Sequence, residues 1–585
     1  MKELSASPEP RQLIRKYALQ NALRHAGKAV DKAVVGKILA SNPELKSQIK
    51  ELFETASEVI EEVNKLTPAQ QEEEIKKNWP ELLEAKKERE EEHRLPPLPN
   101  AEKYKMIVTR FSPNPDSVLH LGSLRAIILS HDYAREYGGK FILRFEDTDP
   151  RLKKSALEFY DSIREDLKWL RCSWDEEYIQ SDRIDTYYDY AEQLLRIGGG
   201  FICDCLKDEF TRQILGEKPC RCRDLPVEEI LRRWRMMHDG SYREGEAVYR
   251  VKTDLHHPNP AVRDWPAFRI IDPEKNPHPR VGGKYRVWPL YNFACGVDDH
   301  LLGITHIIRG KEHMTNTVRQ KYLYEYFHWD YPDAIHYGRL KITDAELSKS
   351  KIVKSVQEGL VSGFDDPRLA TLKALRRRGI TPECLRGMIL EVGAKPIDAT
   401  ISWENVYAFN KKVIDPKANR YFFVSEPIPV RTSKVGQPIE AKLPLHPDYP
   451  ERGARRVELQ PENGVLTLLI SKDDLKFISP GKVIRFIELF NVRIWETGPS
   501  SITAEFHSKS IESAREVNAP LVQWVKADDN LDVEVVMPDA SIKRGKGEVG
   551  LRNEKADNAV QLVRFGFARV DEASEPKIRL YFAHE

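Results

Sequence analysis

Residues 110–123 read RFSPNPDSVLHLGS and lie between two segments of different character. Residues 106–109 before them are mainly apolar and β-branched, which predicts a strand. Residues 124–137 after them carry apolar side chains at helical spacing, and residues 140–145, KFILRF, predict the next strand. Strand, turn, helix and strand in this order are typical of a parallel α/β sheet. Nucleotides dock at such turns because free amides and the positive end of a helix dipole favour phosphate.

Two residues of this turn suit a phosphate ligand. Gly122 lets the backbone approach a ligand closely, and His120 can donate a hydrogen bond to phosphate oxygens. A histidine and a glycine at a helix start are more often structural than catalytic, so the turn alone does not identify a nucleotide site.

A second loop, ELSKSK at residues 346–351, follows strand-like residues 335–340. Two lysines between small hydroxyl residues make a cationic loop that can reach a transferring phosphate. Taken alone, a solvated loop is the simpler interpretation.

Composition narrows the class of protein. The chain has 585 residues, enough for about four domains. Lys and Arg number 92 against 91 Asp and Glu, so any nucleic-acid surface must be a local patch. No apolar run approaches the roughly 18 residues of a membrane-spanning helix. The N-terminus has no apolar signal core, and seven cysteines are too few for a secreted disulfide framework, so we expect a cytoplasmic protein without membrane partners.

The character of the sequence changes several times along the chain. The first 95 residues are rich in Lys and Glu with helical periodicity and end in a charge run at 84–94, and LPPLP at 95–99 is a linker because proline cannot continue a helix. Strand-like runs at 287–291 and 304–308 resume the sheet after an insertion. We therefore expect an α/β protein that divides into a helical appendage with its linker (1–100), the first half of the sheet (101–198), an inserted module (199–285), the second half with the second loop (286–350), a helical region (351–416) and a β-barrel region (417–585).

The barrel prediction rests on short apolar runs alternating with turn residues at regular spacing. These runs are residues 420–424, 465–470, 483–487 and 533–536.

Four of the seven cysteines fall within 20 residues, as Cys203, Cys205, Cys220 and Cys222. Four thiolates on two short knuckles suit tetrahedral Zn²⁺. With all ligands supplied by protein, such a zinc is structural. The Cys-x-Cys spacing is tighter than the commoner Cys-x-x-Cys, and free thiols or a redox pair are the alternatives.

Together, the two loops resemble the HIGH and KMSKS signatures of class I aminoacyl-tRNA synthetases. The pattern from Arg110 to Gly122, RFEDTDP at 144–150 and VDDHLLGITHIIRG at 297–310 are similar to the glutamyl and glutaminyl branch, most closely to archaeal-type glutamyl-tRNA synthetases. The resemblance covers nearly the whole chain and implies a Rossmann-type catalytic domain. The chain departs from the family pattern at Ser117, Ser123, Cys295 and Glu346.

The resemblance implies ATP-dependent attachment of L-glutamate to tRNA through glutamyl-adenylate, with release of AMP and diphosphate and with Mg²⁺ accompanying ATP. It implies catalytic roles for His120 and Lys349. The implied ATP-binding residues are His120, Gly122, Ser123, Leu347, Ser348 and Lys349, and the implied glutamate-binding residues are Arg110, Ser112, Asn114, Glu146, Tyr291 and Arg309.

These roles make chemical sense. The guanidinium groups of Arg110 and Arg309 can hold a side-chain carboxylate by charge-assisted hydrogen bonds. Glu146 can receive the substrate ammonium or form an ordinary salt bridge with Arg144. Lys349 can stabilise charge growing on the α-phosphate and diphosphate, so that no protein nucleophile is needed.

The resemblance also implies that the inserted module faces the tRNA acceptor end and that the barrels read the anticodon. Trp524, Lys543, Arg544 and Lys546 are candidate anticodon contacts, with solvated surface as the alternative. Arg376, Arg377 and Arg378 are candidate phosphate contacts, or else a helix C-terminus capped by Gly379. The N-terminal helices are candidates for binding protein partners.

Two alternatives stay open at this point. Glutaminyl-tRNA synthetases typically carry Thr-Asn-Pro where this chain has Thr148-Asp-Pro150, and Glu where it has Asn114, so both positions favour glutamate. A non-catalytic paralogue that binds tRNA or protein is disfavoured by the intact His120, Gly122 and Lys349. The sequence does not decide whether glutamine tRNA is also charged.

Overall fold

The computed structural model describes residues 10–24, 27–41, 49–80, 82, 95–343, 347–498, 500–574 and 577–585. The chain forms two compact units, Met1–Pro96 and Pro97–Glu585. The charge run at 84–94 and Glu346 lie outside the described residues. No helix in the described ranges combines the length and apolar character needed to cross a membrane.

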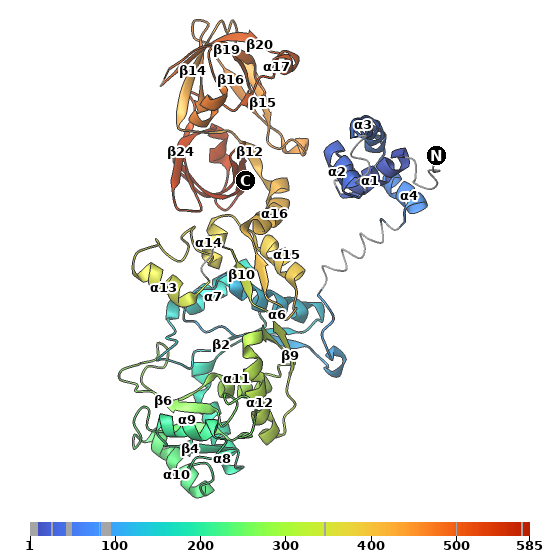
Figure 1. Cartoon of the computed structure of the whole chain (residues 1–585). Helices are drawn as coiled ribbons and strands as arrows, with labels where there is room; N and C mark the ends of the chain where they lie inside the picture. The colour runs from blue at the N-terminus through green and yellow to red at the C-terminus, as the bar shows by residue number, and fades with distance from the viewer. Residues whose placement is uncertain are drawn as a thin grey trace. The chain divides into compact units, whose positions relative to one another are not determined.

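The first unit is helical, as predicted. α4 begins after Thr67, whose hydroxyl and backbone form a capping box with Gln70. Apolar side chains such as Ile14, Val59 and Val63 form its core. The helices are α1 (Pro10–Arg24), α2 (Asp31–Ser41), α3 (Ile49–Lys65) and α4 (Pro68–Asn78) (Figure 1).

A parallel sheet in two halves begins the second unit, which confirms the α/β prediction. One half has the strand order β1-β2-β3, and the other pairs β8 with β9. The Thr305 amide donates to the Val108 carbonyl at 2.9 Å, so β8 lies beside β1 and the halves form one surface. The strands are β1 (Val108–Phe111), β2 (Lys140–Phe145), β3 (Glu176–Ile179), β8 (His306–Gly310) and β9 (Asp333–Tyr337), and the helices beside them are α6 (Leu124–Glu136), α7 (Leu157–Trp169), α11 (Tyr291–Leu301) and α12 (Met314–Phe327).

An antiparallel sheet of four strands interrupts the two halves, in the order β4-β5-β6-β7. The strand predicted at 287–291 does not resume the parallel sheet: β7 ends at Pro289 and pairs with β6. That prediction was wrong because the strand forms its hydrogen bonds with the inserted sheet: the Leu290 amide donates to the Ala267 carbonyl at 2.7 Å, and α11 follows. The domain boundaries stay predictions. The elements here are α8 (Ile184–Arg196), β4 (Gly200–Cys203), α9 (Lys207–Leu215), α10 (Val227–His238), β5 (Val248–Val251), β6 (Pro266–Ile270) and β7 (Val287–Pro289).

The helical region that follows returns to the turn at 110–123. The Leu121 amide donates to the Ala370 carbonyl and the Leu372 amide donates to the Leu119 carbonyl, each at 3.0 Å, so His120 is bridged to Thr371. The region contains β10 (Leu340–Ile342), α13 (Lys349–Gln357), α14 (Leu372–Arg377), α15 (Pro382–Val392), β11 (Ala399–Ile401) and α16 (Trp403–Ile414).

The arginines at the end of α14 contact the tail, and a phosphate contact for them stays a prediction. Arg378 is buried and donates to the Tyr407 hydroxyl at 2.7 Å and to the Ala583 carbonyl at 3.3 Å. Gly379, at φ +79°, ends the helix, and the Ile380 amide donates to the Leu375 carbonyl. The helix-end interpretation is therefore confirmed.

The tail contains two seven-stranded sheets and a hairpin (Figure 1). The single strand predicted at 420–424 is two strands, β12 and β13, at opposite edges of one sheet. That sheet comprises β12 (Asn419–Tyr421), β25 (Ala559–Leu562), β26 (Gly566–Ser574), β27 (Lys577–His584), β23 (Leu531–Val536), β24 (Ile542–Gly547) and β13 (Phe423–Ser425). The other comprises β21 (Leu521–Val522), β18 (Val483–Phe486), β19 (Asn491–Thr497), β20 (Ile502–Ser508), β14 (Pro427–Ser433), β17 (Leu466–Ser471) and β22 (Val525–Lys526), and the hairpin pairs β15 (Ile439–Pro444) with β16 (Ala454–Leu459).

Trp524 is not a surface platform for a base. It is 2% exposed, and its indole N–H donates to the Ile487 carbonyl at 2.9 Å. The prediction for Trp524 was wrong because the residue belongs to the core of the tail. Arg544 and Lys546 lie on β24 in ion pairs with carboxylates of β23.

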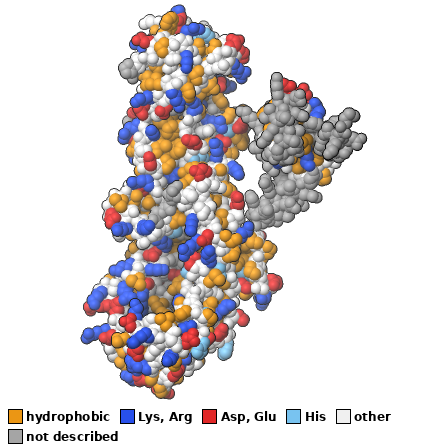
Figure 2. Space-filling model, viewed as in Figure 1, with side chains coloured by type: hydrophobic (Ala, Val, Ile, Leu, Met, Phe, Trp, Pro, Cys, Tyr) orange, Lys and Arg blue, Asp and Glu red, His pale blue; other side chains and the backbone are white. Residues whose placement is uncertain are grey.

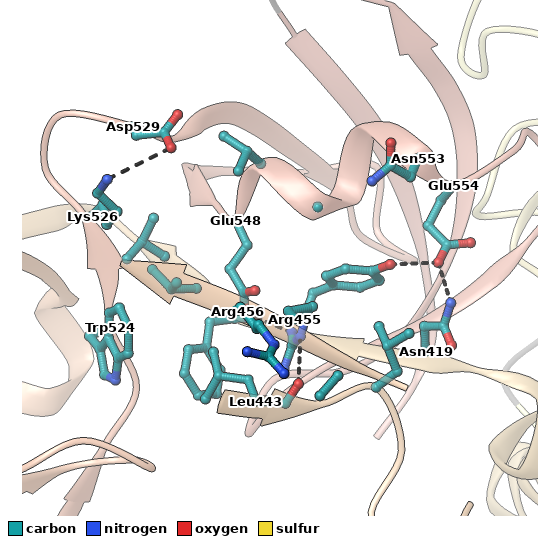
Figure 3. Close-up of a pocket in the computed structure, with 18 of the residues that line it drawn as sticks. Asn419, Leu443, Arg455, Arg456, Trp524, Lys526, Asp529, Glu548, Asn553 and Glu554 are labelled. Carbon is teal, nitrogen blue, oxygen red and sulfur yellow. Dashed lines mark hydrogen bonds and ion pairs between the residues drawn. The ribbon is translucent and has the colours of Figure 1, made fainter. Parts of the chain in front are cut away.

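A tail cavity of about 1050 Å³ lies between these sheets and the hairpin (Figure 3). Arg455 and Glu548 form an ion pair of 2.8 Å there. Glu554 accepts hydrogen bonds from the Asn419 amide at 2.6 Å and the Tyr421 hydroxyl at 2.7 Å. Figure 2 shows Lys and Arg side chains interspersed with Asp and Glu side chains over the visible face.

Candidate active site

A cavity of about 770 Å³ lies at the carboxyl ends of β1, β2 and β8, the edge where parallel sheets bind ligands. We call it the catalytic cavity. Eight predicted site residues line it: Arg110, Ser112, Asn114, Ser123, Glu146, Tyr291, Arg309 and Lys349.

Arg110 is held in place by a carboxylate from α11. Its Nε and Nη2 donate to the two oxygens of Asp299 at 2.9 and 3.2 Å. Arg144 donates to Asp299 at 2.8 Å and to Glu146 at 3.0 Å. Burial opposes ionisation of Asp299, but the two guanidinium groups outweigh it and hold its pKa at about 2. The positive charge of Arg110 is thus balanced within the protein by the carboxylate of Asp299.

Arg309 differs from Arg110 in its partners. It is 5% exposed, and its Nη2 donates to the Thr317 hydroxyl at 2.7 Å, the Gln320 Oε1 at 3.0 Å and the Tyr331 hydroxyl at 3.1 Å. Its Nη1 reaches only the Tyr291 hydroxyl, at 3.4 Å. Among the described residues every hydrogen-bond partner of this cation is uncharged.

The charged groups around Arg309 and Arg110 also carry more positive than negative charge. Asp298 accepts from Arg183 at 2.8 Å and lies 3.9 Å from Arg144, which joins these groups to Asp299. We define the buried charge cluster as four cations, Arg110, Arg144, Arg183 and Arg309, with three carboxylates, Glu146, Asp298 and Asp299. Five of these are buried, and the side chains of Arg183 and Glu146, 21% and 12% exposed, lie at the edge of the cluster. Its formal charge is therefore one positive unit, which an anionic ligand can balance.

Buried polar atoms of the catalytic cavity also lack partners. These atoms are the Ser112 hydroxyl, the Asn114 Oδ1, the Arg269 Nε, the Asn292 Oδ1 and the Arg309 Nε, within the part of the chain that the structure describes. Buried polar atoms are normally hydrogen-bonded, so this set suits a polar ligand.

His120 is set up as a neutral hydrogen-bond donor. The Gly122 amide donates to its Nδ1 at 3.0 Å, which leaves the ring proton on Nε2. Burial, together with the charge of Lys349, lowers the pKa of His120 to about 4. A Cβ on Gly122 would lie 2.8 Å from the His120 Cε1, so a side chain there would displace the ring.

Lys349 is the first residue of α13 and reaches the turn at 110–123. Its Nζ lies 3.0 Å from the Asp116 Oδ1 and 3.4 Å from the Asn114 carbonyl. Leu347 lies beside Gly122, and the Ser348 hydroxyl is 3.2 Å from that of Ser350. The structure therefore brings the two predicted loops together.

The four clustered cysteines also converge. Their sulfur atoms all lie within 4.8 Å of one another, with Cys203 and Cys220 at 3.9 Å and Cys205 and Cys222 at 3.7 Å. A tetrahedral zinc with Zn–S bonds of about 2.3 Å requires sulfur separations of about 3.8 Å. The donor set and these separations fit a metal ion, and all four cysteines are free of disulfides.

Comparison with known protein families agrees with the resemblance that the sequence motifs indicated. Residues 106–416 match the family described as tRNA synthetases class I (E and Q), catalytic domain, and residues 418–509 and 521–571 match two anti-codon binding domains of the same class. The chain belongs to the glutamyl and glutaminyl family of class I tRNA synthetases.

Two curated relatives match this chain over nearly its whole length. The glutamate–tRNA ligase of Thermococcus kodakarensis is 52% identical over 99% of this chain and 100% of its own length. That of Pyrococcus furiosus is 51% identical over 99% and 100%. The solved glutamate tRNA ligase of Elizabethkingia meningosepticum, in complex with its amino acid, is 23% identical with a TM-score of 0.40, covering 54% of this chain and 71% of that one.

Three functional candidates of this synthetase were missed from sequence. Asp298 and Asp299 stand in the quoted motif at 297–310 but were given no role, because their arginine partners are more than 100 residues away. Asp116 was also passed over, although it lies within the turn at 110–123. The sequence did hold a signal for Asp116, because a carboxylate is unexpected in a turn that is otherwise suited to bind anions.

Proposed function

We propose that this synthetase activates L-glutamate with ATP and transfers the glutamyl group to the 3′-terminal adenosine of tRNA. The observation that carries the proposal is Arg309, a buried cation with uncharged partners in a cluster of net charge +1. Glutamate carries two carboxylates and one ammonium, whereas glutamine is neutral overall. Of these two amino acids, only glutamate balances the buried charge cluster. The relatives named glutamate–tRNA ligases support this substrate.

In this proposal Arg309 binds the side-chain carboxylate, with Arg110 beside it as a second donor. Glu146 receives the ammonium, because it lines the catalytic cavity and its carboxylate is held in place by hydrogen bonds from Arg144 and Cys295 to Oε1. The remaining glutamate-binding residues, Ser112, Asn114 and Tyr291, supply uncharged hydrogen bonds.

The substrate α-carboxylate attacks the α-phosphorus of ATP, diphosphate leaves, and a ribose hydroxyl of tRNA then displaces AMP from the carbonyl carbon. The His120 Nε2–H, the backbone at Gly122 and Ser123, and the loop at Leu347 and Ser348 position the phosphates. Lys349 stabilises their developing charge. ATP enters with Mg²⁺, whose charge offsets part of that of the phosphates.

The four-cysteine cluster holds Zn²⁺ in this proposal. A closed set of four thiolates leaves no position for water, so the metal stabilises the inserted module rather than reacting. The same family membership supports the predicted placement of this module at the tRNA acceptor end and of the tail at the anticodon. A protein-binding role for the N-terminal helices and a cytoplasmic location stay predictions.

Arg309→Gln tests the proposal. The ratio of kcat/KM for glutamate to that for glutamine, measured with a single glutamate tRNA, should fall by about 100-fold or more, because sites built around a buried polar partner discriminate by about 10⁴. Arg319→Gln is the matched control: Arg319 lines the same cavity but donates to the Ala261 carbonyl at 2.6 Å. If both activities fall together in Arg309→Gln, the assignment of the pocket is wrong.

A further inference from the structure

Two of the four uncharged partners of Arg309 lie on one helix, α12. Thr317 and Gln320 lie one turn apart on α12, and Tyr331 follows the helix. Gln320 is completely buried, and its Oε1 accepts from the Arg309 Nη2 at 3.0 Å and from the Tyr331 hydroxyl at 2.8 Å. Gln320 therefore positions both the Arg309 guanidinium and the Tyr331 hydroxyl.

Packing and hydrogen bonding alone do not account for a glutamine here. Its Nε2 has no partner among the described residues, and a buried amide that is left unpaired destabilises the folded protein because its hydration is not replaced. A carboxylate of nearly the same shape would remove that cost and pair with Arg309 by stronger, charge-assisted bonds. The neighbouring Arg110 is held in this way, by Asp299.

The difference between the two side chains lies in charge. A carboxylate at position 320 would bring the buried charge cluster to zero before the substrate arrives. The amide oxygen orients the guanidinium equally well but leaves its charge in place.

We propose that Gln320 is a specificity-determining residue, which orients Arg309 with an uncharged acceptor and thereby reserves the guanidinium charge for the side-chain carboxylate of the amino acid. This inference rests on the proposed function. Gln320 acts through Arg309 and is a positioning residue, not a catalytic one.

Gln320→Glu supplies the decisive measurement. Glutamate would then meet a second carboxylate at Arg309, whereas glutamine would enter a pocket that is already balanced. A like charge brought into contact costs several kcal/mol, so the ratio of kcat/KM for glutamate to that for glutamine should fall by about 10² to 10³. Most of the change should be a loss for glutamate.

Gln320→Met is the matched control, similar in volume but without an acceptor or a charge. Both amino acids should lose activity together, and their ratio should stay within about tenfold of the parent. The ratio compares two substrates on one preparation, so it does not depend on the fraction of folded enzyme. If Gln320→Glu folds too poorly to assay, Thr317→Asp brings a carboxylate to the same Nη2 and should lower the ratio in the same direction.

The outcomes separate this inference from the proposed function when Arg309→Gln is assayed beside them. An unchanged ratio in Gln320→Glu, with a large change in Arg309→Gln, overturns the role of Gln320 alone. An equal fall in Gln320→Met and Gln320→Glu also overturns it, because charge would not be the cause. If neither Arg309→Gln nor Gln320→Glu changes the ratio, the proposed glutamate pocket itself fails.

Discussion

The tail cavity and the catalytic cavity are both lined by arginines and carboxylates, yet they treat charge differently. In the tail cavity, Arg455 pairs with Glu548 at 2.8 Å, and Glu554 is bonded to Asn419 and Tyr421 (Figure 3). In the catalytic cavity, Arg309 is held by uncharged oxygens. A buried arginine, Arg455, is paired with a carboxylate inside the protein in the first case, whereas Arg309 is left for a ligand in the second.

Judged by volume alone, the tail cavity would be the stronger candidate for a ligand site. The tail cavity measures about 1050 Å³ and the catalytic cavity about 770 Å³. Because leaving a buried cation uncompensated is costly, an unbalanced site indicates a charged ligand more directly than an empty volume does.

The largest expected effect concerns the compensated pair of the tail cavity. Arg455→Met leaves Glu548 buried without its partner and should destabilise the tail by about 3–5 kcal/mol. Arg455→Met with Glu548→Gln should recover much of that loss. Thermal unfolding followed by circular dichroism measures the change, while the affinity for glutamate should stay the same. A changed preference between glutamate and glutamine would contradict the separation of the two cavities.

The second-largest expected effect is on the rate of the reaction. Lys349→Ala should lower kcat by about 10²–10³, because the ammonium acts on charge that develops in the transition state. Glutamate binding, measured by calorimetry, should change little. Lys354→Ala is the control on the same helix, since that side chain is 71% exposed and pairs with Glu358. Equal losses in ground-state binding and rate would count against the role of Lys349.

A third test extends the comparison to the cysteine cluster, where a metal would supply the balancing charge. Protein purified without added metal should contain about one zinc per chain, and Cys220→Ser should lose it. Arg233→Gln should weaken zinc retention by about 10- to 100-fold, since the Arg233 Nη1 lies 3.5 Å from the Cys222 sulfur. Competition with a chelator measures retention. If the parent protein, purified without chelator, contains no metal and its four cluster thiols titrate freely, the site is excluded.

The smallest expected effect tests the donor geometry of His120. In Gly122→Ala the added Cβ meets the imidazole at 2.8 Å, so the ring must move. The KM for ATP should rise by about tenfold, which corresponds to about 1.4 kcal/mol, a typical value for one hydrogen bond to a charged group. The preference for glutamate should not change. A KM for ATP equal to that of the parent would show that the ring position is not important for phosphate binding.

The sequence predicts best what is local. His120, Gly122 and the strand at 140–145 are read from adjacent residues, and the four cysteines from their spacing. The pairing of Arg110 with Asp299 spans 189 residues, and no local pattern contains it. Burial is a further limit, because Trp524 resembles a surface aromatic residue until the strands around it are packed.

The failed strand predictions have similar causes. A run of apolar residues does not reveal which partner a strand pairs with. Residues 420–424 therefore read as one strand although they contribute two edges of a sheet. Residues 287–291 read as a return to the parallel sheet although they complete the inserted one.

The bridge between His120 and Thr371 has a consequence for dissecting the chain into fragments. A fragment that ends before residue 370 would contain both halves of the parallel sheet, yet it would lack the two backbone hydrogen bonds that flank His120. A fragment that ends at residue 416 would keep them but would remove the Ala583 carbonyl that receives Arg378. The smallest fragment expected to retain ordered catalytic geometry therefore extends past α14, and it needs a substitute for the tail at Arg378.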